Sequence, residues 1–190
     1  MKNFPEIRLA SGRTIGHGHP CFVVAEIGNN HQGCLVTARE MVHAAARAGV
    51  DAVKFQKRHT ASLLTRSGRA RAYTSAASFG KTYGEHRDAL ELSVADMAEL
   101  KALATSLGLV FFASVWDAVS LGQMIDLGVE LVKIASADLT SIPLLRAVGA
   151  TGVPVVASTG MSDWLEIDRG VTELRSFHDR IVLLHCNSSY

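Results

Sequence analysis

The chain has 190 residues, and 48% of them are hydrophobic. That is enough to bury a core without a disulfide or a structural metal, so we expect a single domain over residues 1–190. With 19 basic and 18 acidic side chains and only 6% aromatic residues, the sequence offers no field that would attract nucleic acid or a membrane surface. The three cysteines, Cys21, Cys34 and Cys186, form neither an even set nor a CxxC pair, which indicates reduced thiols and a cytoplasmic location.

Residues 1–20 precede the main pattern of the chain. Ile7 to Ile15 alternates apolar and polar residues around Ser11-Gly12, which predicts a small β-hairpin. We expect this hairpin to plug the bottom of the fold. No apolar run in the chain approaches the roughly 18 residues of a membrane-spanning helix.

After residue 20 a unit recurs, in which a short apolar run, a polar or glycine-containing turn and an amphipathic segment follow one another. This alternation indicates parallel strands joined by crossover helices, an α/β fold. The predicted strands are Cys21 to Ile27, Ala52 to Phe55, Val110 to Ala113, Leu131 to Ile134, Pro154 to Ala157 and Ile181 to His185. The predicted helices include Val36 to Ala48, Val94 to Leu107, Ala118 to Leu127 and Trp164 to Phe177, with Ser93 and Ser162-Asp163 as N-cap candidates.

The segment from Gln56 to Leu92 interrupts this regularity. It follows the second predicted strand and is rich in Ser, Thr, Arg and Gly. A long loop inside a compact domain is usually functional or disordered, so the segment is a candidate for a role at the site.

Polar side chains stand at the end of every predicted strand, and in a parallel α/β fold that edge carries function. They are Glu26, Lys54 with Gln56, Ser114, Lys133 with Ser136, Ser158 with Thr159, and a final group from His185 to Tyr190. Two lysines and three small hydroxyl groups at the same edge of the sheet predict a site for a small polyanion, such as a phosphate plus a carboxylate. Glu26 is the acid available for proton transfer or for a substrate hydroxyl.

Each of these residues has a plainer interpretation, and the sequence leaves both open. Lys54 and Lys133 lie in apolar runs, from which a lysine can extend to solvent. Glu26 can serve as the partner of one lysine in a structural ion pair. Any single serine can simply cap a helix or bond loop backbone.

Five stretches, taken together and in order, resemble the N-acetylneuraminate (sialic acid) synthase family. They are Ala25 to Gly33, Ala52 to Gln56, Thr82 to Arg87, Lys133 to Ser136 and Ser158 to Met161. The resemblance implies a (β/α)8 TIM barrel, of which this chain covers about six of the eight strands. It also implies a transferase that condenses phosphoenolpyruvate with N-acetylmannosamine, or a related N-acetylated amino sugar, to give a nonulosonic acid and phosphate.

The resemblance assigns roles residue by residue. Glu26, Lys54 and Lys133 are the catalytic candidates, with both lysines holding phosphoenolpyruvate. The substrate-binding candidates are Gln56, Ser114, Ser136, Asp138, Ser158, Ser188 and Tyr190. Asp138 stands where many relatives have Glu and Trp116 where Pro-Phe is usual, which leaves the identity of the amino sugar open.

A complete barrel of this kind takes about 250 residues. We therefore expect the chain to be a truncated barrel that lacks synthase activity by itself. The family's divalent metal, Mn or Mg, is expected to have its ligands beyond residue 190 and none within this chain, and the full-length form is expected to be a homodimer. Two alternatives are another phosphoenolpyruvate-condensing keto-deoxy sugar acid synthase and a non-catalytic remnant that binds phosphorylated ligands.

Overall fold

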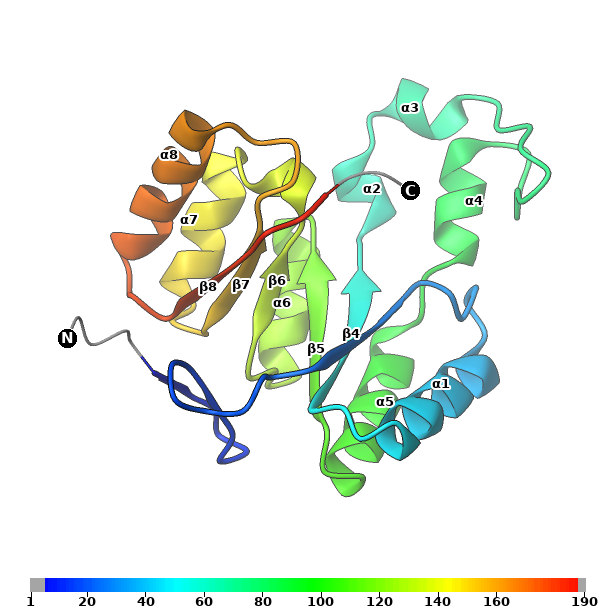
Figure 1. Cartoon of the computed structure of the whole chain (residues 1–190). Helices are drawn as coiled ribbons and strands as arrows, with labels where there is room; N and C mark the ends of the chain where they lie inside the picture. The colour runs from blue at the N-terminus through cyan, green and yellow to red at the C-terminus, as the bar shows by residue number, and fades with distance from the viewer. Residues whose placement is uncertain (1–5, 188–190) are drawn as a thin grey trace.

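The computed structural model describes residues 6–187, which contain a parallel sheet of six strands in sequential order. These strands are β3 (Val24–Gly28), β4 (Ala52–Lys57), β5 (Val110–Val115), β6 (Val132–Ile134), β7 (Val155–Ser158) and β8 (Ile181–Leu184). Each pairs in parallel with its neighbour, so the sheet curves into an open half-barrel with its helices on the outer side (Figure 1). The predicted parallel α/β barrel architecture is confirmed.

The helices alternate with the strands. They are α1 (Leu35–Arg47), α5 (Val94–Ser106), α6 (Ala118–Asp126), α7 (Ile142–Ala150) and α8 (Trp164–Arg175), with a 3-10 turn η1 at Ser136–Asp138. Ser93 and Asp163 cap α5 and α8 in full capping boxes, as their side chains predict. The sequence pattern did not single out α7. It predicted an end for α8 two residues too late, because Ser176 caps the helix with helical backbone angles and the chain continues in a hydrogen-bonded turn.

Alternate residues along the strands pack into two separate cores. On β4 and β5, Val53, Phe55 and Phe111 join the cluster beneath the helices. Ala52 and Phe112 join a second cluster on the concave face of the sheet. Because strand side chains alternate between faces, the polar residues in phase with the second cluster must also lie on the concave face.

The N-terminal hairpin is present as β1 (Ile7–Arg8) paired antiparallel with β2 (Thr14–Ile15). Gly12 in its turn has φ of 85°, a conformation that favours glycine. Ile7 and Leu9 pack into the concave-face cluster, and the hairpin lies at the end where the strands begin (Figure 1).

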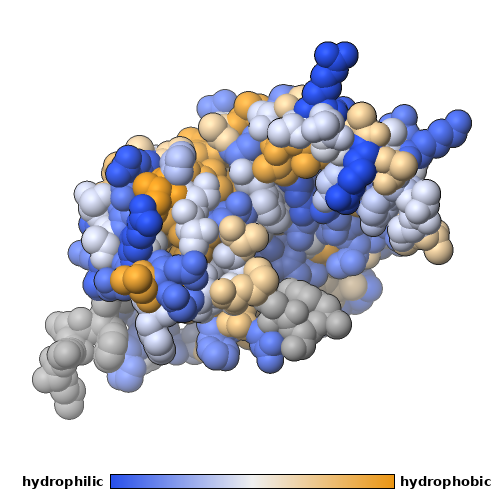
Figure 2. Space-filling view, turned by 90° about the horizontal axis from the view of Figure 1, so that it is seen from above, coloured by the Kyte–Doolittle hydropathy of each residue, from blue (hydrophilic) through white to orange (hydrophobic). Residues whose placement is uncertain are grey.

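The insertion after β4 is ordered into α2 (Thr60–Leu63), α3 (Arg66–Ala70) and α4 (Tyr83–Ala89). It stands at the opposite end, toward which the strands run (Figure 1). A capping box between Thr82 and Glu85 starts α4, and the Tyr73 and His86 rings lie with their centres 4.5 Å apart and their planes tilted by 31°. Seen from this end, hydrophilic and hydrophobic residues are interspersed over the surface (Figure 2). No helix within residues 6–187 is long and apolar enough to cross a membrane.

Candidate active site

The concave face of the sheet holds a cleft of about 810 Å³ that extends from Ile15 of the hairpin to the carboxyl ends of the strands. Register explains why the predicted residues meet there: Glu26 pairs with Lys54 across β3 and β4, and Ser114 pairs with Lys133 across β5 and β6. The polar lining consists of Glu26, Asn29, Asn30, Lys54, Gln56, Ser114, Lys133, Ser136, Ser158 and Asn187.

Lys54 lies at the floor of the cleft and is only 7% exposed, so it does not extend to solvent. Its ammonium group forms an ion pair with Glu26 and donates to the Ser114 hydroxyl at 3.0 Å. Burial lowers the pKa of Lys54, and the negative charge of Glu26 partly opposes this. The ion pair that the sequence left open is present, and it leaves the half-exposed Glu26 side chain facing the cleft.

Lys133 is also buried, at 6% exposure. Its ammonium donates to the Ser158 hydroxyl at 2.5 Å and to the Ile134 carbonyl oxygen at 2.7 Å. Burial, with the nearby positive charge of Lys54, lowers the pKa of Lys133 to about 8. A buried ammonium whose hydrogen-bond partners are neutral retains its attraction for an incoming anion.

Gly28 makes room for the acidic side of the cleft. It follows a register irregularity in β3 and has φ of 61°, which favours glycine. A Cβ atom at this position would lie 3.0 Å from the Glu26 Oε1 atom and 3.3 Å from the Gln56 Nε2 atom. Glu26 and Gln56 therefore converge on the space that the missing side chain leaves.

Two further predicted residues, Ser136 and Asp138, lie in the η1 turn that follows β6. The Ser136 hydroxyl accepts a hydrogen bond from the Gly160 amide at 3.1 Å, which ties the turn after β6 to the turn after β7. Asp138 has a buried Oδ2 atom with no hydrogen-bond partner, and burial raises its pKa to about 6. The predicted residues Ser188 and Tyr190 lie outside the described residues.

His31 is not part of the cleft lining within residues 6–187. The ring is buried, and its Nδ1 atom accepts from the Gly33 amide at 3.1 Å. Asn30 donates its side-chain amide to the Ile27 carbonyl oxygen. Both residues therefore hold the loop after β3, and Asn30 also lines the cleft.

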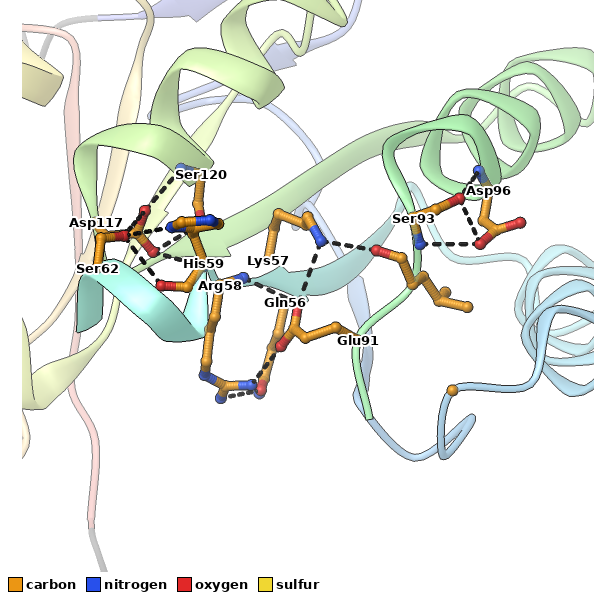
Figure 3. Close-up of polar contacts among 12 residues, drawn as sticks. Gln56, Lys57, Arg58, His59, Ser62, Glu91, Ser93, Asp96, Asp117 and Ser120 are labelled. Carbon is orange, nitrogen blue, oxygen red and sulfur yellow. Dashed lines mark hydrogen bonds and ion pairs between the residues drawn. The ribbon is translucent and has the colours of Figure 1, made fainter. Parts of the chain in front are cut away.

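Sequence reasoning missed Arg58 and Glu91. Arg58 follows β4 with its guanidinium 3.9 Å from the centre of the Trp116 ring, which lines the cleft. It also pairs with Glu91 and donates to the Gln56 side chain (Figure 3). The available signal was spacing, because Arg58 continues the two-residue spacing of Lys54 and Gln56 just past the end of β4.

Within residues 6–187, no three or more His, Cys, Asp and Glu side chains are grouped so that they could hold a metal ion. The described residues therefore do not by themselves fit the divalent ion that the resemblance implies. The position of this ion stays a prediction.

Residues 41–190 match the model of the NeuB family. The chain belongs to the NeuB family. It is 37% identical over 185 residues to the human N-acetylneuraminate-9-phosphate synthase, covering 97% of this chain and 52% of the relative. It is also 37% identical over 181 residues to the N,N'-diacetyllegionaminic acid synthase of Legionella pneumophila, covering 92% of this chain and 51% of that protein.

The fold agrees with a solved member of the family. The N-acetylneuraminic acid (sialic acid) synthetase of Leptospira borgpetersenii superposes with a TM-score of 0.84 at 31% identity, over 98% of this chain and 60% of that structure. The chain thus spans about half the length of the curated relatives it matches.

Proposed function

We propose that this chain carries the phosphoenolpyruvate-binding half of a nonulosonic acid synthase. The observation that carries the proposal is the pair of buried lysines, Lys54 and Lys133, converging on one cleft with hydroxyl partners at their tips. Family membership supports the reaction class, because the named relatives are sialic and legionaminic acid synthases.

Phosphoenolpyruvate suits this site because it places two anionic groups on a short rigid frame. Each ammonium group can bind one of them, with Ser114 and Ser158 able to donate hydroxyl hydrogen bonds once an anion takes over the lysine. The burial that lowers both lysine pKa values also strengthens their attraction for a bound anion, since water no longer screens it.

The acceptor sugar is assigned to the side of the cleft where Glu26 and Gln56 converge. In the proposed reaction, carbon 3 of phosphoenolpyruvate forms a bond to the aldehyde carbon of an acylated amino sugar. The aldehyde oxygen gains a proton to become a hydroxyl, water adds at carbon 2, and inorganic phosphate leaves. Glu26 is placed to orient the aldehyde and to manage that proton.

The first test is calorimetric titration of phosphoenolpyruvate into the chain. We expect saturable binding that inorganic phosphate competes away, and loss of binding in Lys133→Met. Arg69→Met, which removes a surface arginine paired with Asp88, should bind like the wild type. Equal binding by Lys133→Met and wild type would refute the anion site.

The second test addresses the reaction with the complete gene product. Mass spectrometry of reactions containing phosphoenolpyruvate, a divalent metal salt and one of several acylated amino sugars should detect a product larger than the sugar by the elements of one pyruvic acid. Failure with every amino sugar, despite phosphoenolpyruvate binding, would contradict the synthase assignment and favour a phosphate-binding remnant.

A further inference from the structure

Arg58 occupies a position that the proposed reaction does not explain. Its side chain is only 9% exposed, although it lies beside the mouth of the cleft. One face of the guanidinium stacks on Trp116 at 3.9 Å, and the edge contacts Glu91 Oε1 at 3.4 Å. The Arg58 backbone amide donates to the same carboxylate at 3.0 Å, so the arginine is fixed from several sides.

The remaining edge of the guanidinium meets Gln56. An Arg58 terminal nitrogen donates to the Gln56 Oε1 atom at 2.5 Å (Figure 3). A guanidinium has only donors, so the glutamine can meet it only with its oxygen. The Gln56 Nε2 group must then point the other way, toward the space beside Gly28, where it lies 3.3 Å from the ideal Cβ position.

We propose that Arg58 is a positioning residue that fixes the Gln56 side-chain amide so that its N–H donors face the acceptor sugar. Glu26 Oε1 lies 3.0 Å from the same point. One spot in the cleft therefore offers a donor from Gln56 and an acceptor from Glu26. A sugar hydroxyl or an acylamino group, each of which carries both a donor and an acceptor, matches this pair.

The contact with Arg58 holds the Gln56 amide in one orientation before the sugar binds. Without Arg58 the amide of Gln56 could rotate by a half turn, presenting an oxygen beside the Glu26 carboxylate, where two acceptors would face the same ligand group. Glu91 keeps the arginine in place, and it also accepts from the Lys57 ammonium at 3.4 Å. Arg58 therefore acts through Gln56 and does not contact the substrate, whereas the two lysines are proposed to bind the substrate directly.

A ligand-free measurement tests the orientation directly. In 15N–1H spectra, the Gln56 side-chain amide signals can be identified by their absence in Gln56→Ala. Arg58→Met keeps an apolar group against Trp116 and removes every donor, so the Gln56 signals should move toward those of a freely rotating glutamine. Arg69→Met is the matched control and should leave them in place. Unmoved signals in Arg58→Met would overturn the proposal.

Binding tests the consequence, which rests on the proposed function. In saturating phosphoenolpyruvate, N-acetylmannosamine should bind about tenfold more weakly to Arg58→Met and to Gln56→Ala, the loss expected for one hydrogen bond. The double variant should be no weaker than Gln56→Ala alone, because Arg58 acts through Gln56. Arg58→Lys, which can still donate to Gln56, should recover part of the loss.

The outcomes separate this inference from the proposed function. Additive losses of about a hundredfold in the double variant would mean that Arg58 contacts the sugar itself, and the positioning role would be wrong. Equal weakening of phosphoenolpyruvate and sugar binding in Arg58→Met would indicate a collapsed site and would also overturn it. If wild type binds phosphoenolpyruvate but not the sugar, the acceptor assignment fails and the spectra alone decide the role of Arg58.

Discussion

The Lys54 ammonium lies 3.0 Å from the Ser114 hydroxyl, on the neighbouring strand and 60 residues further along the chain. Lys133 repeats the arrangement with Ser158, again on the next strand of the sheet. The two pairs differ in their charge balance, because Lys54 also forms an ion pair with Glu26. No carboxylate within residues 6–187 makes an ion pair with Lys133, whose hydrogen-bond partners are the Ser158 hydroxyl and the Ile134 carbonyl oxygen.

The stability of the folded chain should depend on pH through the protonation of Lys133. Its pKa is about 8 in the folded chain and 10.5 in the unfolded chain, so the unfolded state binds more protons between these values. The free energy of unfolding therefore rises with pH across this window, by up to roughly 3 kcal/mol for this group. Urea unfolding at pH 7 and pH 9.5, which span part of this window, should show about 2 kcal/mol of this gain in wild type relative to Lys133→Met. The same pH response in both proteins would contradict it.

Phosphoenolpyruvate affinity should follow the same titration in the opposite sense. Only the protonated Lys133 attracts an anion, so binding should weaken as pH rises through about 8. Bound anion stabilises the ammonium, which shifts the midpoint upward. Calorimetry from pH 7 to pH 9.5 measures the effect, and an affinity that is constant over this range would show that Lys133 does not hold the ligand.

Lys54→Ala should weaken phosphoenolpyruvate binding far more than sugar binding. It removes one of the two cations of the anion site and leaves the Glu26 carboxylate without its partner, which adds repulsion. We expect a loss of at least tenfold, since charge-assisted hydrogen bonds contribute about 1.5–3 kcal/mol each. Titrations of each ligand separate the two effects. Equal losses of affinity for both ligands would mean that Lys54 does not bind phosphoenolpyruvate directly.

Gly28→Ala should damage the acceptor side of the cleft. The new methyl group would sit 3.0 Å from Glu26 Oε1 on backbone with φ of 61°. Gly49→Ala is a matched control, because its φ of 74° imposes similar backbone strain with no atom within 4 Å of the added group. Both should lose about 1 kcal/mol of stability. Only Gly28→Ala should weaken sugar binding, and an equal effect of the control would refute the steric argument.

Asp117 should contribute more to the free energy of unfolding than an ordinary helix-capping residue. Its carboxylate caps α6 through the Ser120 amide at 2.8 Å and also accepts from the His59 amide at 2.9 Å, which ties down the segment after β4 (Figure 3). Asp117→Ala should cost about 2–3 kcal/mol of unfolding free energy. Asp163→Ala, which removes only the α8 cap, should cost about 1 kcal/mol. Equal losses in urea unfolding would mean that the His59 contact contributes nothing.

The sequence by itself determined the order of the elements and which polar side chains stand at the carboxyl ends of the strands. Each strand appears as an apolar run bounded by turn residues, and polar side chains in phase with the concave face, such as Lys54 and Ser114, must share one surface once the strands are parallel. The capping residues Ser93 and Asp163 could also be predicted from the sequence, because capping depends on residues only three positions away.

Only the tertiary structure decided which groups actually meet and how they are charged. The network of Arg58, Glu91 and Trp116 joins segments from β4, the end of the insertion and the end of β5, and no local pattern encodes such a contact. The lowered pKa of Lys133 and the raised pKa of Asp138 likewise arise from burial, which the sequence does not state residue by residue. Short-range periodicity fixes which face a side chain occupies, whereas desolvation and long-range pairing depend on the packing of the whole sheet.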